Sequence, residues 1–153
     1  MIYTIYLMLS LLFVAADYLT KYAVIANMSL GKTIPLWEGV FHLTHIRNTG
    51  AAFSILSGQR FFLIALPLIV IIAIIGCIIA KKPKNKLLLL SFSMIVSGGI
   101  GNLIDRIRFG YVVDFLDFRL INFPVFNVAD IWVTCGAALF IILLLFSKED
   151  NII

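Results

Sequence analysis

Residues 61–80, FFLIALPLIVIIAIIGCIIA, contain no charged side chain, and no other feature restricts the possible folds as much. A helix rises about 1.5 Å per residue, so about 20 apolar residues cross the hydrocarbon core of a bilayer. The chain of 153 residues is 62% hydrophobic and only 13% charged. Typical soluble domains are about 25% charged. The sequence therefore predicts an integral membrane protein.

Three further runs have the length and composition of membrane spans. The first ends in Asp17 and Lys21 and has no basic residue before its apolar part, so we expect it to be a retained span and not a cleaved signal. The fold class that we expect is an integral membrane protein, mainly α, with four transmembrane helices. The spans lie in a single domain of residues 1–153, at about 1–22, 61–80, 87–104 and 127–146.

The four spans sort the connecting segments onto two sides of the membrane. Both chain ends and the basic loop KKPKNK, 81–86, share one side, and segments 23–60 and 105–126 share the other. The density of basic residues in the short loop favours its side as cytoplasmic. The net charge of +4 is therefore interpreted as a topology signal, and we expect no nucleic-acid binding.

Polar residues near the ends of the first span and of segment 23–60 each allow two interpretations. Asp17 and Lys21 share a helix face. They form either an interfacial ion pair, with Lys21 reaching the headgroups, or a brace for a site. In RNTGAAF, 47–53, Asn48 either bonds its own backbone in a turn or, with the backbone beside Gly50, holds an extended peptide. The β-type residues before this motif predict a short hairpin or sheet.

The third span carries SGGIGN, 97–102, followed by Asp105 and Arg106. The glycines follow no strand, so they predict close helix packing and not a nucleotide-binding loop. Asn102 then points toward whichever element packs on that face. Asp105 and Arg106 are either simple interfacial charges or members of a network that ties the loop ends together.

The fourth span begins with FNVAD, 126–130, which resembles a helix capping box. Asn127 is a natural N-cap and Asp130 stands at the third helical position, where the helix dipole favours a carboxylate. Capping alone would explain both residues.

Neither the cysteines nor the histidines predict a metal or a cofactor. Cys77 and Cys135 lie inside apolar runs and are expected to be small packing residues. His42 and His45 are three apart, so on a strand they point to opposite faces. We expect no metal site and no cofactor.

Carboxylates remain as the groups that could carry chemistry. A short loop brings Asp114 back toward Asp130, and two carboxyl groups at close range share one proton. Such a pair can activate water and protonate a peptide carbonyl, as in aspartic proteases. The alternative is a proton or cation relay in a transporter. A relay needs polar groups along its whole depth, and the second and fourth spans are nearly bare through the middle.

Four segments together resemble the bacterial lipoprotein signal peptidase family, also called signal peptidase II. They are DYLTK (17–21), RNTGAAF (47–53), GGIGNLIDR (98–106), and the pair GYVVDF (110–115) and FNVAD (126–130). Their order and spacing and the four-span layout all agree with this family over essentially the whole chain.

The resemblance implies an aspartic endopeptidase of the bacterial cytoplasmic membrane that cleaves diacylglyceryl-modified prolipoproteins just before the lipidated cysteine. It implies a catalytic dyad of Asp114 and Asp130. The supporting polar positions that it implies are Asp17, Lys21, Asn48, Asn102, Asp105, Arg106 and Asn127. It also implies a small extracytoplasmic β-cradle with a short covering loop or helix, a site near the outer face and cytoplasmic chain ends. We expect membrane lipid as a partner and a monomeric enzyme.

The stretch YVVDFLDF, 111–118, holds a second aspartate besides Asp114. If this stretch is extended, Asp114 and Asp117 point to opposite faces, and Asp117 turns outward toward Arg119. If it is helical, the two aspartates share a face. The resemblance selects Asp114, in agreement with the extended interpretation.

Overall fold

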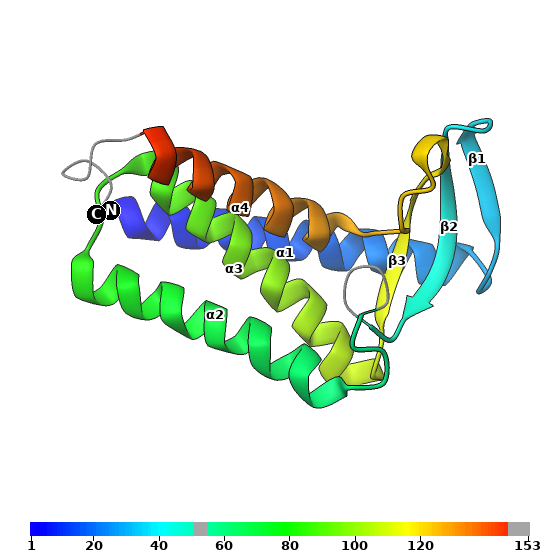
Figure 1. Ribbon diagram of the computed structural model, residues 1–153, viewed down its shortest axis with the longest axis horizontal. Helices are drawn as coiled ribbons and strands as arrows, with labels where there is room; N and C mark the ends of the chain where they lie inside the picture. Colours follow the sequence, from blue (N-terminus) through cyan, green and yellow to red (C-terminus); the bar gives the residue numbers. More distant parts are fainter. Residues whose placement is uncertain (51–54, 147–153) are drawn as a thin grey trace.

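The computed structural model describes residues 1–50 and 55–146 (Figure 1). Four helices are long and apolar enough to cross a membrane, which confirms the four predicted spans. They are α1 (Ile2–Asn27), α2 (Arg60–Lys81), α3 (Lys86–Phe109) and α4 (Val128–Phe146). Helix α1 continues to Asn27 and α3 to Phe109, past the predicted ends at 22 and 104. Positions 51–53 of RNTGAAF lie outside the described residues.

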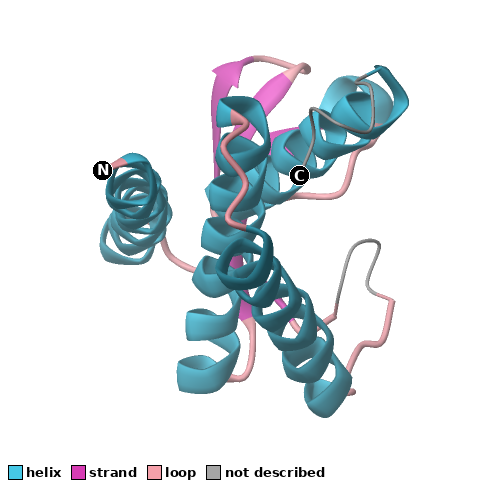
Figure 2. Cartoon of the chain, turned by 90° about the vertical axis from the view of Figure 1, so that its left-hand side faces the viewer, coloured by secondary structure: helices cyan, strands magenta, loops and turns pink. Residues whose placement is uncertain are grey.

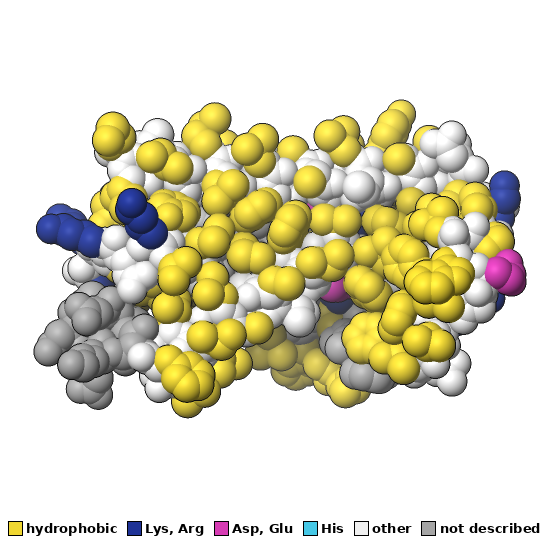
Figure 3. Space-filling view, turned by 90° about the horizontal axis from the view of Figure 1, so that it is seen from above, with side chains coloured by type: hydrophobic (Ala, Val, Ile, Leu, Met, Phe, Trp, Pro, Cys, Tyr) yellow, Lys and Arg dark blue, Asp and Glu magenta, His cyan; other side chains and the backbone are white. Residues whose placement is uncertain are grey.

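Helix α3 is the centre of the bundle. Half of its most apolar stretch is buried, against 6% for α1 and 17% for each of α2 and α4. Figure 2 shows the other three helices arranged around it. The flank seen in Figure 3 is almost wholly hydrophobic, with basic side chains at either end of the molecule. This distribution suits a bundle whose outer surface faces lipid.

Small residues let α3 approach α4 closely, as the glycines of SGGIGN predict. A Cβ on Gly98 would lie 2.7 Å from the Val133 Cγ2 atom, and one on Gly136 would lie 2.9 Å from Met94 Cβ. The Ser91 hydroxyl donates a hydrogen bond of 2.9 Å to the Gly136 carbonyl across the interface. Backbone contact of this kind replaces the hydrophobic driving force that is absent in lipid.

The variant Gly98→Ala is expected to lower the free energy of unfolding by about 1–3 kcal/mol, because the added methyl group forces α3 away from α4. Gly76→Ala is the matched control, since a Cβ there meets no atom within 4 Å. The control should be neutral or slightly stabilising through its higher helix propensity. Thermal unfolding in detergent measures both, and equal stabilities would contradict the packing argument.

A small antiparallel sheet lies at one end of the bundle (Figure 1). Its strands β1 (Thr33–Trp37), β2 (Phe41–Asn48) and β3 (Val112–Phe118) pair in the order β1-β2-β3. This confirms the predicted hairpin and the extended conformation of YVVDFLDF. Val24 of α1 and Met28, which follows α1, pack against Val113 and Phe115 of β3, so the sheet is fixed to the first span.

The connections around the sheet are short. The 3-10 helix η2 (Arg119–Ile121) follows β3, and residues 55–58, between β2 and α2, form turns. The covering segment is expected within 23–60, and the described residues of that range form the end of α1, the strands β1 and β2, and turns. The loop KKPKNK and the start of α1 lie at the end of the bundle opposite the sheet, so the expected sorting of the loops is found (Figure 1).

Candidate active site

Asp114 lies in the middle of β3 and is 1% exposed. Its Oδ2 atom accepts a hydrogen bond of 2.9 Å from the Asn48 amide, and its Oδ1 atom accepts one of 2.6 Å from the Asn127 amide. Asn48 ends the neighbouring strand β2, and Asn127 precedes α4. Three separate elements therefore fix one carboxyl group.

Asp130 stands in the first turn of α4, and the capping box expected there is present. The Asn127 Oδ1 atom accepts from the Asp130 backbone N–H at 2.9 Å, and the Asp130 Oδ2 atom accepts from the Asn127 backbone N–H at 3.1 Å. The second carboxylate oxygen, Oδ1, accepts a bond of 2.8 Å from the Asn102 amide. Asp130 thus caps its helix with one oxygen and directs the other toward α3.

Asn127 connects the two carboxyl groups, because it contacts both of them with different atoms. Its side-chain N–H groups donate to Asp114 and, at 3.0 Å, to the Asn102 Oδ1 atom, while its backbone N–H donates to Asp130. The Asn127 side chain is fully buried. A single residue therefore determines how the carboxyl groups of β3 and α4 are placed relative to each other.

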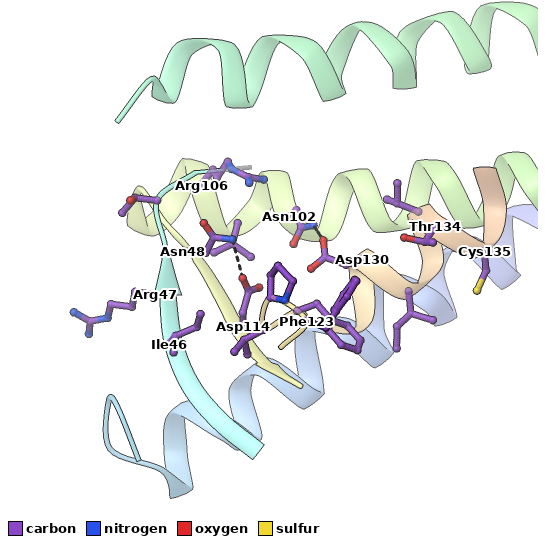
Figure 4. Close-up of a pocket in the computed structure, with 17 residues that line it drawn as sticks. Ile46, Arg47, Asn48, Asn102, Arg106, Asp114, Phe123, Asp130, Thr134 and Cys135 are labelled. Carbon is purple, nitrogen blue, oxygen red and sulfur yellow. Dashed lines mark hydrogen bonds between the residues drawn. The ribbon is translucent and has the colours of Figure 1, made fainter. Parts of the chain in front are cut away.

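Both carboxyl groups line a pocket of about 760 Å³. Figure 4 shows Asp114 and Asp130 on the same side of this pocket, with Asn48 and Asn102 directed at them. One wall of the pocket continues along α4 past the aspartates to Thr134 and Cys135 (Figure 4). The lining residues are Ile46, Arg47, Asn48, Thr49, Asn102, Arg106, Val112, Asp114, Phe123, Pro124, Val125, Phe126, Asp130, Ile131, Val133, Thr134 and Cys135.

The sequence did not predict the wall that α4 forms, which consists of Ile131, Val133, Thr134 and Cys135 and is called the apolar wall below. Thr134 follows Asp130 by one helical turn, so it shares a face with Asp130, and Cys135 stands next to it. Cys135 lines the pocket, whereas it was expected to be a packing residue. Spacing from Asp130 was the available signal. Apolar residues in a span look the same in sequence whether they face lipid or a pocket.

Asp17 and Lys21 are buried, at 1% and 3% exposed, so the interfacial ion pair with a lysine reaching the headgroups is not what forms. The Lys21 ammonium contacts three oxygens: Asp17 Oδ2 at 2.9 Å, Asp105 Oδ2 at 3.0 Å and Asn102 Oδ1 at 3.1 Å. Asp17 Oδ1 accepts from the Ala129 N–H at 2.8 Å. The pair is thus the centre of a network that joins α1, α3 and α4.

This network fixes the orientation of the Asn102 amide. Its Oδ1 atom accepts from Lys21 and from Asn127, both of which can only donate at this contact. Its Nδ2 group must then face Asp130. Lys21 therefore acts on Asp130 through Asn102 without touching it.

Asp105 and Arg106 form the network tying loop ends together, and are not simple interfacial charges. Asp105 also accepts from the Val113 N–H, at 3.2 Å, which joins the end of α3 to β3. Arg106 is 9% exposed and donates a bond of 2.8 Å to the Gly50 carbonyl. Its Nε atom has no hydrogen-bond partner among the described residues.

Asn48 forms the turn that its sequence allows, whereas the holding of an extended peptide stays a prediction. Its Oδ1 atom accepts from the Gly50 N–H at 2.9 Å, which is the expected turn, while its amide donates to Asp114. Asn48 and Gly50 lie beside the pocket, where Asn48 is a lining residue. The turn thus holds the amide in position for Asp114.

Burial and the charge of Asp130 raise the pKa of Asp114 from 3.8 to about 7, although the hydrogen bonds from Asn48 and Asn127 oppose the rise. Neutral pH therefore lies near the midpoint of its titration. Two interacting carboxyl groups titrate as a pair, and this pair gives up its last proton near neutrality.

Asp117 lies on the opposite face of β3, as the extended interpretation predicts. It accepts from the Thr44 hydroxyl and from Arg119, whose Nε atom is 2.9 Å away. Burial raises the pKa of Asp117, but these two partners outweigh burial and hold the pKa below its ordinary value. Asp117 is therefore a structural group of the sheet and not part of the pocket.

Known proteins are similar to this chain in both sequence and fold. The family described as "Signal peptidase (SPase) II" matches residues 9–146. A lipoprotein signal peptidase of Brevibacillus brevis is 42% identical over 95% of this chain and 98% of its own. One of Nostoc punctiforme is 47% identical over 88% and 85%. A solved bacterial membrane enzyme superposes with a TM-score of 0.90 at 33% identity, covering 97% of this chain and 92% of that one.

Proposed function

The chain belongs to the signal peptidase II family, and from this membership we propose that Asp114 and Asp130 are the catalytic dyad of an aspartic endopeptidase that cleaves prolipoproteins just before the lipidated cysteine. Because the chain belongs to this family, it is a lipoprotein signal peptidase and a bacterial membrane protein with several spans. The observation that carries the dyad is the pair of carboxyl groups, in one pocket, bridged by Asn127. Water can reach both groups from the pocket.

The raised pKa of Asp114 supports a proposal for the two roles. Below about pH 7 Asp114 holds the shared proton, so it donates to the carbonyl oxygen of the scissile peptide bond. Asp130 takes a proton from the water that attacks the carbonyl carbon. Asp130 then gives that proton to the nitrogen of the gem-diol. As the C–N bond breaks, one hydroxyl group becomes the new carbonyl and returns its proton to Asp114, so the pair regains its starting state. Asn48, Asn102 and Asn127 keep the two carboxyl groups in position throughout.

Arg106 and the strand ends are suited to hold the substrate. The Arg106 Nε–H group, unpartnered among the described residues and buried at the pocket, can donate to a substrate carbonyl. The peptide before the cysteine lies extended beside Asn48, and the diacylglyceryl chains lie along the apolar wall toward Thr134. Binding energy from the acyl chains then positions the peptide bond at the dyad. From the family resemblance we also propose that the sheet lies at the outer face and both chain ends in the cytoplasm.

The experiment that tests this function uses the purified protein and a synthetic lipoprotein precursor peptide. The peptide carries a diacylglyceryl-modified cysteine, and mass spectrometry identifies the bond that is cut. We expect one cut, immediately before the modified cysteine, and no cut in the same peptide without lipid. Cleavage elsewhere, or equal cleavage without lipid, would refute the proposed specificity. Solute-driven ion flux in liposomes without a peptide product would instead favour the transporter alternative.

The pH dependence of cleavage tests the assignment of the proton. Raising the pH above about 7 removes the proton from Asp114, so kcat/KM should fall up to tenfold per pH unit on the alkaline side. Asn48→Ala removes a hydrogen bond that favours the charged carboxylate. The pKa of Asp114 should then rise, and the alkaline limb should move to higher pH. A limb that stays in place in Asn48→Ala, or moves down, would argue against Asp114 as the acid.

A further inference from the structure

All five arginines of the chain lie at the sheet end of the molecule, whereas the loop at the other end uses only lysine. Arg106 is buried at the site, and Arg119 forms an ion pair with Asp117. The other three, Arg47, Arg60 and Arg108, are exposed. Arginine differs from lysine in offering a planar fork of N–H groups, which matches the oxygens of a phosphate.

These three arginines meet around the last turn of α3. Arg60 donates a hydrogen bond of 2.9 Å to the Ile107 carbonyl. The Arg108 guanidinium lies 5.0 Å from the centre of the Phe109 ring, and that of Arg47 lies 4.7 Å from the centre of the Tyr111 ring. The two rings stack on each other with their centres 5.7 Å apart. One continuous set of contacts thus gathers three positive charges.

No carboxylate among the described residues pairs with these arginines, since the ion pairs there are Lys21–Asp17, Lys21–Asp105 and Arg119–Asp117. Compensation of the helix dipole explains Arg60, which bonds a terminal carbonyl of α3. Arg108, in the last turn of α3, also compensates this dipole, but its guanidinium lies on the Phe109 ring. The dipole does not explain Arg47, which lies on the Tyr111 ring. A guanidinium stacked on a ring keeps the N–H groups at its edge free for another acceptor.

The position of the cluster selects the partner. Arg60 is the first residue of α2, and Arg108 stands at the end of α3, so the cluster marks the level where two spans leave the membrane (Figure 1). The cluster includes Tyr111, and tyrosine sits at the headgroup level of a bilayer. Phe61, Phe62 and Phe109 are exposed beside it, as suits a surface in contact with lipid. Arg47 also lines the pocket, but in Figure 4 its guanidinium points away from Asp114 toward this outer surface.

We propose that Arg47, Arg60 and Arg108 form a binding site for the phosphate of an anionic phospholipid at the sheet end of the bundle. Charge complementarity and the interfacial aromatic residues both favour a lipid headgroup. Each basic residue near an anionic membrane surface contributes about fivefold to binding. The site is separate from the dyad, so its occupancy can be measured without any cleavage.

The test titrates the purified protein in detergent with phosphatidylglycerol or phosphatidylcholine and counts retained lipids by native mass spectrometry. We expect phosphatidylglycerol to be retained more tightly, and the double variant Arg60→Gln/Arg108→Gln to weaken its binding by about 25-fold. Lys84→Gln/Lys86→Gln, which removes two exposed charges at the other end, is the matched control and should leave binding unchanged. If the double variant does not fold, Arg108→Gln alone should weaken binding about fivefold.

Three results would overturn the proposal. Equal retention of the two lipids by the unmodified protein would show that the phosphate charge is not recognised. Unchanged binding in the arginine variants, or equal loss in the lysine control, would show that these arginines do not form the site. Displacement of phosphatidylglycerol by an equal concentration of inorganic phosphate would show a site for free phosphate instead of lipid.

Discussion

Asp114→Asn protein is expected to fold and to insert into membranes, and to cleave the diacylglyceryl peptide at least about 10³-fold more slowly than the unmodified protein. Asparagine keeps the shape of the side chain but can neither hold nor donate the shared proton. One of the Asn48 and Asn127 amides keeps an oxygen acceptor, while the other faces the new NH2 group, so a moderate loss of stability accompanies the loss of activity. The loss should therefore appear in kcat, with a smaller change in KM.

Asp117→Asn is the matched control for this variant, because it makes the same chemical change three residues away on the other face of β3. It removes a structural ion pair with Arg119, so a small loss of stability and nearly unchanged cleavage are expected. Asp130→Asn should abolish cleavage as well, with an added loss of about 1 kcal/mol from weaker capping. Cleavage that survives in the double variant Asp114→Asn/Asp130→Asn would eliminate the dyad.

Lys21→Met is expected to lower the free energy of unfolding by about 3–5 kcal/mol, the usual effect of leaving buried charges without a partner. Methionine fills similar space but leaves Asp17, Asp105 and Asn102 without the ammonium group they share. Denaturant titration in detergent measures the loss. Lys32→Met is the control, because Lys32 is exposed, and it should change stability by less than about 0.5 kcal/mol.

A second variant distinguishes the loss of charge pairing at Lys21 from the change in side-chain volume. In Lys21→Met/Asp105→Asn one of the uncompensated charges is gone, so this double variant should be more stable than Lys21→Met. Lys21→Met should also reduce cleavage, because the Asn102 amide is then free to turn its oxygen toward Asp130. If Lys21→Met were as stable as the unmodified protein, the buried network would contribute nothing to stability.

Much of the fold could be predicted from the sequence because membrane spans depend on length and composition alone. Residues 61–80 are an example, since a charge-free run of that length has few alternatives. The hairpin and the capping box were also predictable, because both arise from residues close together in the chain. The roles of Asp114 and Asp130 stay predictions, supported by the family resemblance and by the geometry.

The partners of Lys21 could not be predicted in the same way. Helical spacing gives Asp17, but Asn102 and Asp105 are more than 80 residues away, and only the packing of α1 on α3 brings them together. Whether Lys21 is exposed or buried depends on this packing, so the sequence left both interpretations open. Orientation across the membrane has a different cause, since it follows from charge around the spans and not from contacts within them.

The hydrogen bond from the Ala129 N–H to Asp17 joins the last helix of the chain to the first. In a protein made from its N-terminus onward, α1 enters the membrane long before α4 has been synthesised. Asp130 and Asn127 arrive with α4, so neither the dyad nor its bridge exists in any shorter nascent chain. We infer that the protease is inactive during its own biosynthesis and becomes active only when its final segment inserts.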